Sequence, residues 1–261
     1  MDFLSDTPIS TPTSTRTPNP EQAAVIYADI NENQRVLAGP GAGKTFTIAL
    51  RYAELVESGI SPDNIVAVTY SSSMAKELLE RIAKTVELTD RAVKQICTIH
   101  ALCYRTLRFE GMRRDVPKDW QIKKLLGEIA EELWDNPSAR PAWKELQKWI
   151  DLPKHRGITS ADDGKLYAHL VSDYTAKLLH QARAQYDMRM ANNGWIDFAS
   201  MVFEMEQRLI RDRNFREKYQ GLWTHVIVDE AQDSSAQALR ILMTLSLDQG
   251  DNRVYSGWRP I

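Results

Sequence analysis

Ala38-Gly39-Pro40-Gly41-Ala42-Gly43-Lys44-Thr45 is the stretch that decides the fold of this 261-residue chain. It follows a short apolar segment, Arg35 to Leu37, and leads into a helical pattern, Thr47 to Val56. A glycine-rich loop between a strand and a helix is the context of a phosphate-binding loop. Its glycines let backbone N–H groups turn toward phosphate oxygens, and the positive end of the helix adds to the attraction. The stretch therefore predicts a site for the phosphates of a nucleotide.

The residue types of this loop suggest separate roles. Lys44 would reach the β- and γ-phosphates, and the Thr45 hydroxyl would ligate Mg²⁺. Backbone groups of the remaining residues would surround the phosphates, namely Gly39, Pro40, Gly41, Ala42 and Gly43. Ala38 stands where the general pattern has glycine, and a glycine-rich turn without a ligand is the less favoured alternative.

A second stretch, Val226-Ile227-Val228-Asp229-Glu230-Ala231-Gln232-Asp233, ends an apolar strand with two carboxylates. Ligands of open α/β folds bind at the carboxyl ends of the strands. Asp229 would hold Mg²⁺ through its water shell, and Glu230 would orient and deprotonate the attacking water. Carboxylates at a strand end can also merely cap the next helix. Together with the loop, however, they indicate hydrolysis of a nucleoside triphosphate.

The composition is that of an ordinary globular protein, with 43% hydrophobic and 26% charged residues. No apolar run reaches membrane-spanning length and the first residues lack a signal-peptide pattern, so we expect no membrane association and a cytoplasmic location. Cys97 and Cys103 indicate neither a zinc site nor a disulfide framework, and we interpret them as buried reduced thiols. The net charge of -2 neither supports nor excludes binding to DNA.

The order of apolar patterns indicates an α/β protein with a parallel sheet flanked by helices. Residues 1–18, rich in Ser, Thr and Pro, are expected to be a disordered tail. Helices are expected at 20–30, 46–58, 74–87, 197–209 and from Ala101 onward, and strands at 34–37, 65–70, 96–99 and 225–228. Residues 111–194 are expected to form an inserted helical subdomain with breaks at 136–137, 152–153 and 161–164, in which most of Trp120, Trp134, Trp143 and Trp149 serve packing.

Four further motifs accompany these two stretches: Asn19-Pro20-Glu21-Gln22, the segment from Thr69-Tyr70-Ser71 to Arg81, Thr98-Ile99-His100, and Trp195-Ile196-Asp197-Phe198. Their ordered combination, with the acidic motif extended to Gln237, resembles the first motor domain of superfamily 1 helicases of the UvrD/Rep/PcrA type. The resemblance covers residues 19 to about 242. It implies a RecA-like P-loop NTPase domain comprising 19–110 and 195–261, with the all-helical subdomain 111–194 inserted.

For the nucleotide, the resemblance implies ATP and Mg²⁺ as cofactors. Gln22 would read the adenine edge and select ATP over GTP, because its amide can both donate and accept. Phe46 stands where close relatives often carry an arginine that packs on the nucleotide. Gln232 and Asp233 would link the γ-phosphate region to the DNA side. The implied catalytic group is therefore Lys44, Asp229, Glu230 and Gln232, with Thr45 and Asp229 at the metal.

For partners, the resemblance implies single-stranded DNA and duplex junctions. Thr69, Tyr70 and Ser71 belong to the segment that grips a single strand, with Tyr70 available to stack on a base. Thr98 and His100 would donate hydrogen bonds to backbone phosphates. Ser72 and Ser73 replace an Asn-Lys pair that is frequent in the family, and a histidine that merely caps a helix is the structural alternative for His100.

The end of the chain departs from the family pattern. Residues 249–259 imperfectly echo the next family motif, and the second motor domain with its phosphate-facing arginines is expected to be absent. Two hypotheses follow. The chain is the ATP-binding motor domain of a helicase, or it is a truncated nucleotide- or DNA-binding module that regulates or completes another helicase and has little ATPase activity alone. A partner protein that supplies the second domain would support the second hypothesis. A small-molecule kinase is disfavoured because no substrate lid is evident and the acidic extension fits a helicase.

Overall fold

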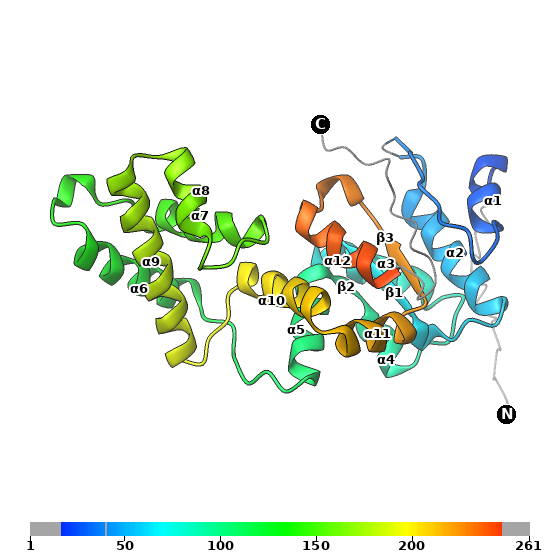
Figure 1. Cartoon of the computed structure of the whole chain (residues 1–261). Coiled ribbons are helices and arrows are strands. Elements are labelled where there is room, and N and C mark those ends of the chain that lie inside the picture. Colours follow the sequence, from blue (N-terminus) through cyan, green and yellow to red (C-terminus); the bar gives the residue numbers. More distant parts are fainter. Residues whose placement is uncertain (1–16, 40, 247–261) are drawn as a thin grey trace, which may run out of the picture.

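A computed structural model describes residues 17–39 and 41–246. The predicted N-terminal tail lies almost entirely outside these residues, as do Pro40 and the motif echo at 249–259. The described chain is an α/β structure that is mostly helical, with one small parallel sheet (Figure 1). None of the helices in this described part is long and apolar enough to cross a membrane.

Among the described residues the sheet has three parallel strands, in the order β2-β1-β3. β1 spans Ile65–Thr69, β2 spans Ile96–Thr98 and β3 spans His225–Val228. In the register, Thr69 lies opposite Thr98, and Val68 lies opposite Val228. The carboxyl ends of all three strands therefore meet at one edge of the sheet, as parallel pairing requires.

Helices cover both faces of the sheet, because the alternating side chains of β1 enter two separate apolar cores. Ile65 and Ala67 pack with residues of α2 (Lys44–Glu57) and α3 (Ser72–Ile82). Val66 and Val68 pack with residues of α5 (Ile99–Phe109), α10 (Phe198–Arg211), α11 (Arg213–Leu222) and α12 (Ala236–Ser246). The shorter elements of this sheet lobe are α1 (Pro20–Ile26), η1 (Pro62–Asn64), α4 (Asp90–Gln95) and η3 (Ala231–Asp233).

Both cysteines are buried as free thiols in the apolar core that contains Val66 and Val68. Burial raises the pKa of Cys97 to about 11.

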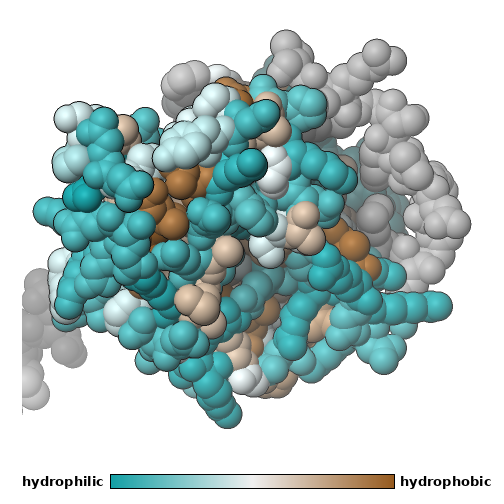
Figure 2. Space-filling view, turned by 60° about the vertical axis from the view of Figure 1, so that its left-hand side comes forward, coloured by the Kyte–Doolittle hydropathy of each residue, from teal (hydrophilic) through white to brown (hydrophobic). Residues whose placement is uncertain are grey.

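A helical lobe lies beside the sheet lobe and has an apolar core of its own (Figure 1). It consists of α6 (Asp119–Leu133), η2 (Pro137–Ala139), α7 (Trp143–His155), α8 (Asp163–Leu170) and α9 (Asp173–Asn192). Trp134 is buried in this core and Trp143 and Trp149 pack against it, whereas Trp120 is 63% exposed. With this side of the molecule turned forward, hydrophilic residues cover most of the surface and apolar ones show only in small areas (Figure 2).

A buried polar joint links the two lobes. Lys154 of α7 is 2% exposed, and its Nζ lies 3.4 Å from an oxygen of Asp197, 3.0 Å from Asp187 of α9 and 2.8 Å from the Ser200 hydroxyl. Asp197 caps α10 by accepting a hydrogen bond from the Ser200 N–H, and the Tyr186 hydroxyl donates to the same carboxylate. The first turn of α10 is thus held by charged groups from the helical lobe.

Two sequence-based expectations about elements were wrong. No strand forms at 34–37: these described residues have irregular backbone, and Leu37 is 84% exposed. A strand inside a parallel sheet needs a continuous apolar run, and here Val36 and Leu37 stand alone after Gln34 and Arg35.

The expected break at Leu152-Pro153 was also wrong, because α7 continues through Pro153 to His155. Proline lacks the N–H that would bond to the carbonyl four residues earlier, which is that of Trp149. The Tyr167 hydroxyl of α8 donates to this carbonyl instead, at 2.9 Å. A tertiary contact therefore replaces the missing helical hydrogen bond.

Candidate nucleotide-binding site

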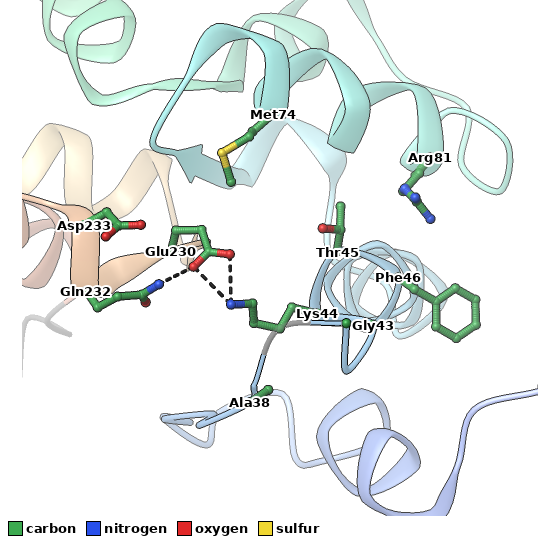
Figure 3. Close-up of a pocket in the computed structure, with 11 residues that line it drawn as sticks. Ala38, Gly43, Lys44, Thr45, Phe46, Met74, Arg81, Glu230, Gln232 and Asp233 are labelled. Carbon is green, nitrogen blue, oxygen red and sulfur yellow. Dashed lines mark hydrogen bonds and ion pairs between the residues drawn. The ribbon is translucent and has the colours of Figure 1, made fainter.

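A cavity of about 640 Å³ opens where the glycine-rich loop meets the carboxyl ends of the strands (Figure 3). One wall is the loop and the start of α2, a second is α3, and a third is the turn after β3. The described lining residues are Ala38, Gly41, Gly43, Lys44, Thr45, Phe46, Met74, Arg81, Glu230, Gln232 and Asp233. The structure thus brings together the loop and the acidic motif, which are 186 residues apart at Lys44 and Glu230.

Lys44 and Glu230 form an ion pair across this cavity. The Lys44 Nζ lies 2.9 Å from one Glu230 carboxylate oxygen and 3.0 Å from the other. The hydrogen bond to Glu230 raises the pKa of Lys44, and the same bond lowers the pKa of Glu230. Both groups are therefore charged at neutral pH, and a phosphate entering the cavity competes with Glu230 for the lysine.

Glu230 reaches the cavity through an unusual backbone conformation. Its φ of 53° and ψ of 46° lie in the left-handed region, and it is the one non-glycine residue with positive φ in the described chain. A residue other than glycine held in this region stores strain, and such residues cluster at functional sites. The Gln232 side chain donates to the same carboxylate, which fixes its direction.

The oxygen donors around Thr45 suit Mg²⁺. Magnesium prefers oxygen ligands and usually keeps several waters, with one or two carboxylates and substrate phosphates completing the shell. Thr45, Glu230 and Asp233 supply a hydroxyl and carboxylates to the cavity. Asp229 is 4% exposed behind them, and its N–H bonds to the Val68 carbonyl at 2.8 Å. Burial, and then the charge of Glu230, raise the pKa of Asp229, so its ionised form is disfavoured unless a cation lies nearby.

No group of three or more His, Cys, Asp and Glu residues within the described ranges could hold a metal alone. The Thr45 hydroxyl and the carboxylates of Glu230 and Asp233 are oxygen donors of the kind that Mg²⁺ takes, so the donor set fits the predicted cofactor.

Gln22 contacts the loop itself. Its Nε2 donates to the Ala42 carbonyl at 2.9 Å, and its Oε1 accepts from the Asn19 N–H at 3.0 Å. Asn19 in turn caps α1 by accepting from the Gln22 N–H at 2.8 Å. Gly41 and Gly43 have φ values of 76° and 83°, a region that residues with a Cβ rarely adopt. The loop conformation is thus set by its glycines and supported by α1.

The predicted DNA-contacting residues lie along the same edge of the sheet. Thr69 is buried and its hydroxyl donates to the Ser71 carbonyl at 3.0 Å. Ser71 caps α3, and Thr98 caps α5 by accepting from the Ala101 N–H at 3.3 Å. These three residues shape the ends of β1 and β2, whereas Tyr70 between them is 62% exposed.

His100 lies on the first turn of α5 and packs edge-on against Phe198, with ring centroids 5.2 Å apart. Phe198 is 58% exposed. Partial burial, and then the proximity of His155, lower the pKa of His100, so the ring is neutral at neutral pH. A neutral imidazole can donate one hydrogen bond to a phosphate, but it brings no positive charge.

Sequence reasoning missed two residues that line the cavity, namely Met74 and Arg81. Met74 and Arg81 were grouped with the DNA-gripping segment, because they follow Tyr70 along the chain. They are seven positions apart in α3, which is about two helical turns, so both occupy one face. That spacing was the available signal, but only the packing of α3 over the loop assigns this face to the cavity.

The structure defines the class of protein as α/β, consistent with part of a RecA-like domain. Its parallel sheet, its glycine-rich loop at the start of a helix and its acidic strand end all face one cavity. The model of the UvrD/REP helicase N-terminal domain matches residues 18–253. The chain belongs to this family.

Individual relatives agree with this assignment. DNA helicase II of Escherichia coli (strain K12) is 27% identical over 263 residues, which cover 92% of this chain and 34% of the relative. DNA helicase II of Salmonella typhimurium gives the same values. ATP-dependent DNA helicase PcrA of Staphylococcus aureus (strain Mu50) is 26% identical over 241 residues, which cover 86% of this chain and 32% of the relative. The chain thus spans about a third of the length of these relatives.

Proposed function

We propose that this chain is the ATP-binding motor portion of a DNA helicase, and that it couples hydrolysis of Mg·ATP to movement on single-stranded DNA and, in a complete enzyme, to duplex unwinding. The observation that carries the proposal is the direct pairing of Lys44 with Glu230 across the cavity. A phosphate-binding lysine and a candidate water-activating carboxylate face the same space, which is what phosphoryl transfer to water requires.

In this mechanism the chain mainly positions the phosphates and the attacking water and polarises the reacting groups. Lys44 leaves Glu230 for the β- and γ-phosphates, and backbone N–H groups of the loop hold the phosphate oxygens. The released Glu230 carboxylate accepts the proton of the attacking water. Thr45 and Asp229 would hold Mg²⁺, which when bound neutralises charge on the phosphates. Gln232, already bonded to Glu230, would keep that carboxylate directed at the water.

The residues proposed to contact DNA lie at the same edge of the sheet as those proposed to bind the nucleotide. Tyr70 follows β1, His100 follows β2 by two residues, and Glu230 follows β3 by two residues. A change at Glu230 on nucleotide binding can reach Tyr70 through β1, because the Asp229 N–H bonds to the Val68 carbonyl. We infer that nucleotide state and DNA contact are coupled across this edge.

The test is Mg·ATP binding and steady-state hydrolysis by the whole chain, with and without single-stranded DNA. Lys44→Ala should abolish binding and hydrolysis, because it removes the charge that faces the phosphates. Glu230→Gln should keep binding, since Lys44 is no longer paired with a carboxylate, but should lower hydrolysis by at least about 10²-fold, within the range of general-base catalysis. Lys84→Ala and Glu87→Gln remove the same side-chain types from exposed positions and serve as controls.

Hydrolysis that survives Glu230→Gln at the wild-type rate would refute the assigned role of this carboxylate. Binding without hydrolysis in the wild-type chain would instead favour the alternative of a nucleotide-binding module that regulates or completes another helicase. If Mg·ATP does not bind at all, the nucleotide site itself is disproved.

A further inference from the structure

The turn that carries Glu230 is anchored on both of its sides. We call residues 229–235, which connect β3 to α12, the acidic turn. Glu230 points from this turn toward Lys44 (Figure 3), with its backbone in the left-handed region. A strained residue keeps such a conformation only where the surrounding structure holds it. The contacts that hold the acidic turn therefore decide where the Glu230 carboxylate lies.

Bonds to β1 and to the start of α12 hold the two ends of the acidic turn. On the strand side, the Asp229 N–H donates to the Val68 carbonyl at 2.8 Å. On the helix side, the Ser235 hydroxyl accepts from the Ala238 N–H at 3.1 Å, so α12 begins directly after the turn. Gln237, the second residue of α12, is fully buried.

The acidic turn is also compact within itself. The Asp233 N–H donates to the Glu230 carbonyl at 2.9 Å, and the Ser234 N–H donates to the Ala231 carbonyl at 3.2 Å. Because these local bonds tie the turn together, a displacement of the first turn of α12 is passed on to Glu230.

Gln237 fixes the start of α12 to the helical lobe. Its Nε2 donates to the Lys154 carbonyl of α7 at 2.8 Å and to one carboxylate oxygen of Glu206 of α10 at 2.7 Å. The Arg240 Nε donates to the other Glu206 oxygen at 2.6 Å. Gly157, just beyond α7, packs so closely that an added Cβ would stand 3.2 Å from the same carboxylate. Parts of α7, α10 and α12 thus meet at the buried Glu206.

The buried acceptors at this junction do not depend on Gln237 alone. The Lys154 carbonyl also accepts from the Gly157 N–H at 2.9 Å, and Glu206 keeps its bond to Arg240. The Gln237 Oε1 is itself buried without a hydrogen-bond partner among the described residues, which is unfavourable for stability. A leucine of similar size would bring no such atom. The glutamine therefore contributes direction to α12 more than it contributes stability.

We propose that Gln237 is a positioning residue for hydrolysis. By fixing α12 to the helical lobe, it holds the acidic turn in the conformation that directs the Glu230 carboxylate at Lys44 and at the attacking water. The helical lobe consequently takes part in the chemical step without touching the nucleotide. This inference rests on the proposed function and names a further residue on which the same site depends.

The kinetic test is steady-state hydrolysis of Mg·ATP by the whole chain, with Mg·ATP binding measured by isothermal titration calorimetry. Gln237→Leu should lower kcat about tenfold and leave KM and the dissociation constant within about twofold, because a slightly misplaced carboxylate affects the transition state rather than phosphate binding. Gln220→Leu is the matched control. The Gln220 Nε2 donates to the Thr244 carbonyl at 2.6 Å, at the opposite end of α12, and its loss should change none of these constants.

A second pair of variants disturbs the junction from the side of the helical lobe. Gly157 and Gly194 have φ values of 71° and 66°, so alanine brings similar backbone strain at both positions. A Cβ at Gly157 presses on Glu206, whereas a Cβ at Gly194 meets nothing within 4 Å among the described residues. The kcat of Gly157→Ala should therefore fall about threefold or more below that of Gly194→Ala, at a similar melting temperature.

Melting temperatures test the positioning without any need for turnover. Glu230→Asn and Glu230→Gln both remove the charge, but asparagine adopts the left-handed conformation more readily than glutamine. The Glu230→Asn chain should therefore melt about 1–3 °C above the Glu230→Gln chain. Adding Gln237→Leu should reduce this difference by about half or more, because the released turn relaxes. Adding Gln220→Leu should leave it intact.

An unchanged kcat in Gln237→Leu, or an equal loss of kcat and of Mg·ATP affinity, would overturn the positioning role. The same kcat in Gly157→Ala and Gly194→Ala would overturn the part assigned to the helical lobe. A wild type that does not hydrolyse Mg·ATP would refute the proposed hydrolysis, and the melting temperatures would then decide by themselves whether Gln237 holds the turn. A difference between the two Glu230 variants that survives Gln237→Leu in full would show that it does not.

Discussion

Asp151 of α7 is a partly buried residue, with a buried Oδ1, beside the polar joint between the lobes. Burial, and then the charge of Asp197, raise the pKa of Asp151 to about 7. Its Oδ1 has no hydrogen-bond partner among the described residues. Lys154, which favours the ionised form, lies nearer to Asp187 and Asp197 and neutralises those carboxylates first. The folded chain therefore keeps a proton on Asp151 up to about neutral pH.

The first prediction concerns the pH dependence of stability. In the unfolded chain an aspartate has a pKa of about 3.9. Between about pH 4 and 7 the folded state thus binds a proton that the unfolded state has released, so this group makes the free energy of unfolding fall as pH rises. The neutral Asp151→Asn variant lacks this loss, so its stability relative to wild type should rise by roughly 2–3 kcal/mol between pH 5 and pH 8, at about 1.4 kcal/mol per pH unit below the folded pKa.

Urea unfolding at pH 5, 6.5 and 8 measures this difference. Asp135→Asn removes an exposed carboxylate from the same lobe and should follow wild type at each pH. Parallel pH profiles of wild type and Asp151→Asn would show that Asp151 is ionised in the folded chain throughout.

At the scale of single residues, the sequence predicted the residues of the two motifs but not Asp151. Lys44, Thr45, Asp229 and Glu230 were found because a local pattern specifies each of them, although their roles remain to be tested. Asp151 carries no such pattern. Its environment is created by groups from α7, α9 and α10, and no spacing along the chain brings those groups together.

At the scale of elements, α7 contains a proline, and a neighbouring helix replaces the hydrogen bond that this proline cannot make. The Tyr167 hydroxyl donates to the Trp149 carbonyl, which Pro153 leaves without its helical partner. Tyr167 is fully buried, so water cannot take over this role easily. The last turn of α7 therefore depends on α8.

The second prediction is that Tyr167→Phe lowers the free energy of unfolding by about 1–3 kcal/mol, because a carbonyl inside the lobe loses its donor. Restoring the helical N–H with Pro153→Ala should reduce this cost, so a double-mutant cycle should give a clear interaction energy. The measurement is denaturant unfolding of the four chains. Tyr174→Phe, on a ring that is 67% exposed, is the matched control. Strictly additive effects would show that the hydroxyl and the proline act independently.

The elements that could be predicted are those with a strong local signal. β3 spans His225–Val228 as expected, because an apolar run is bounded by polar residues. β1, β2 and α10 lie within one or two residues of the expected bounds. The expected strand at 34–37 and the expected break at 152–153 failed for opposite reasons. The strand had too little apolar surface to be buried, and the break was prevented by a contact from another helix.

At the scale of the whole molecule, the parallel sheet directs the nucleotide residues and the predicted DNA residues to one edge. Tyr70 projects from this edge with most of its ring exposed, and Phe198 lies against His100 nearby. The helical lobe is fixed to the same region, since Asp197, which precedes Phe198, pairs with the buried Lys154. The position of Phe198 in this exposed aromatic surface therefore depends on the helical lobe.

The third prediction is weak binding of single-stranded DNA without sequence preference. Contacts to phosphates release counterions, so affinity should fall steeply between 50 and about 200 mM salt, and stacking makes it sequence-tolerant. Tyr70→Ala should weaken binding about tenfold, in line with the loss of one stacked base. Fluorescence anisotropy with labelled oligonucleotides of two unrelated sequences measures this.

Tyr174→Ala removes an equally exposed ring from the helical lobe and should leave the affinity unchanged. Binding that is insensitive to salt, or that differs strongly between the two sequences, would contradict a surface of phosphate contacts and stacking. An equal loss in Tyr70→Ala and Tyr174→Ala would place the strand elsewhere.

The left-handed backbone of Glu230 has a consequence for engineering. Glycine adopts this conformation without the steric cost that a Cβ brings, which is about 1–2 kcal/mol. A selection for thermostability would therefore favour Glu230→Gly, and a ranking of variants by melting temperature would promote chains without the carboxylate that faces Lys44. Stabilised forms of this protein should be screened for turnover from the first round, with position 230 held constant.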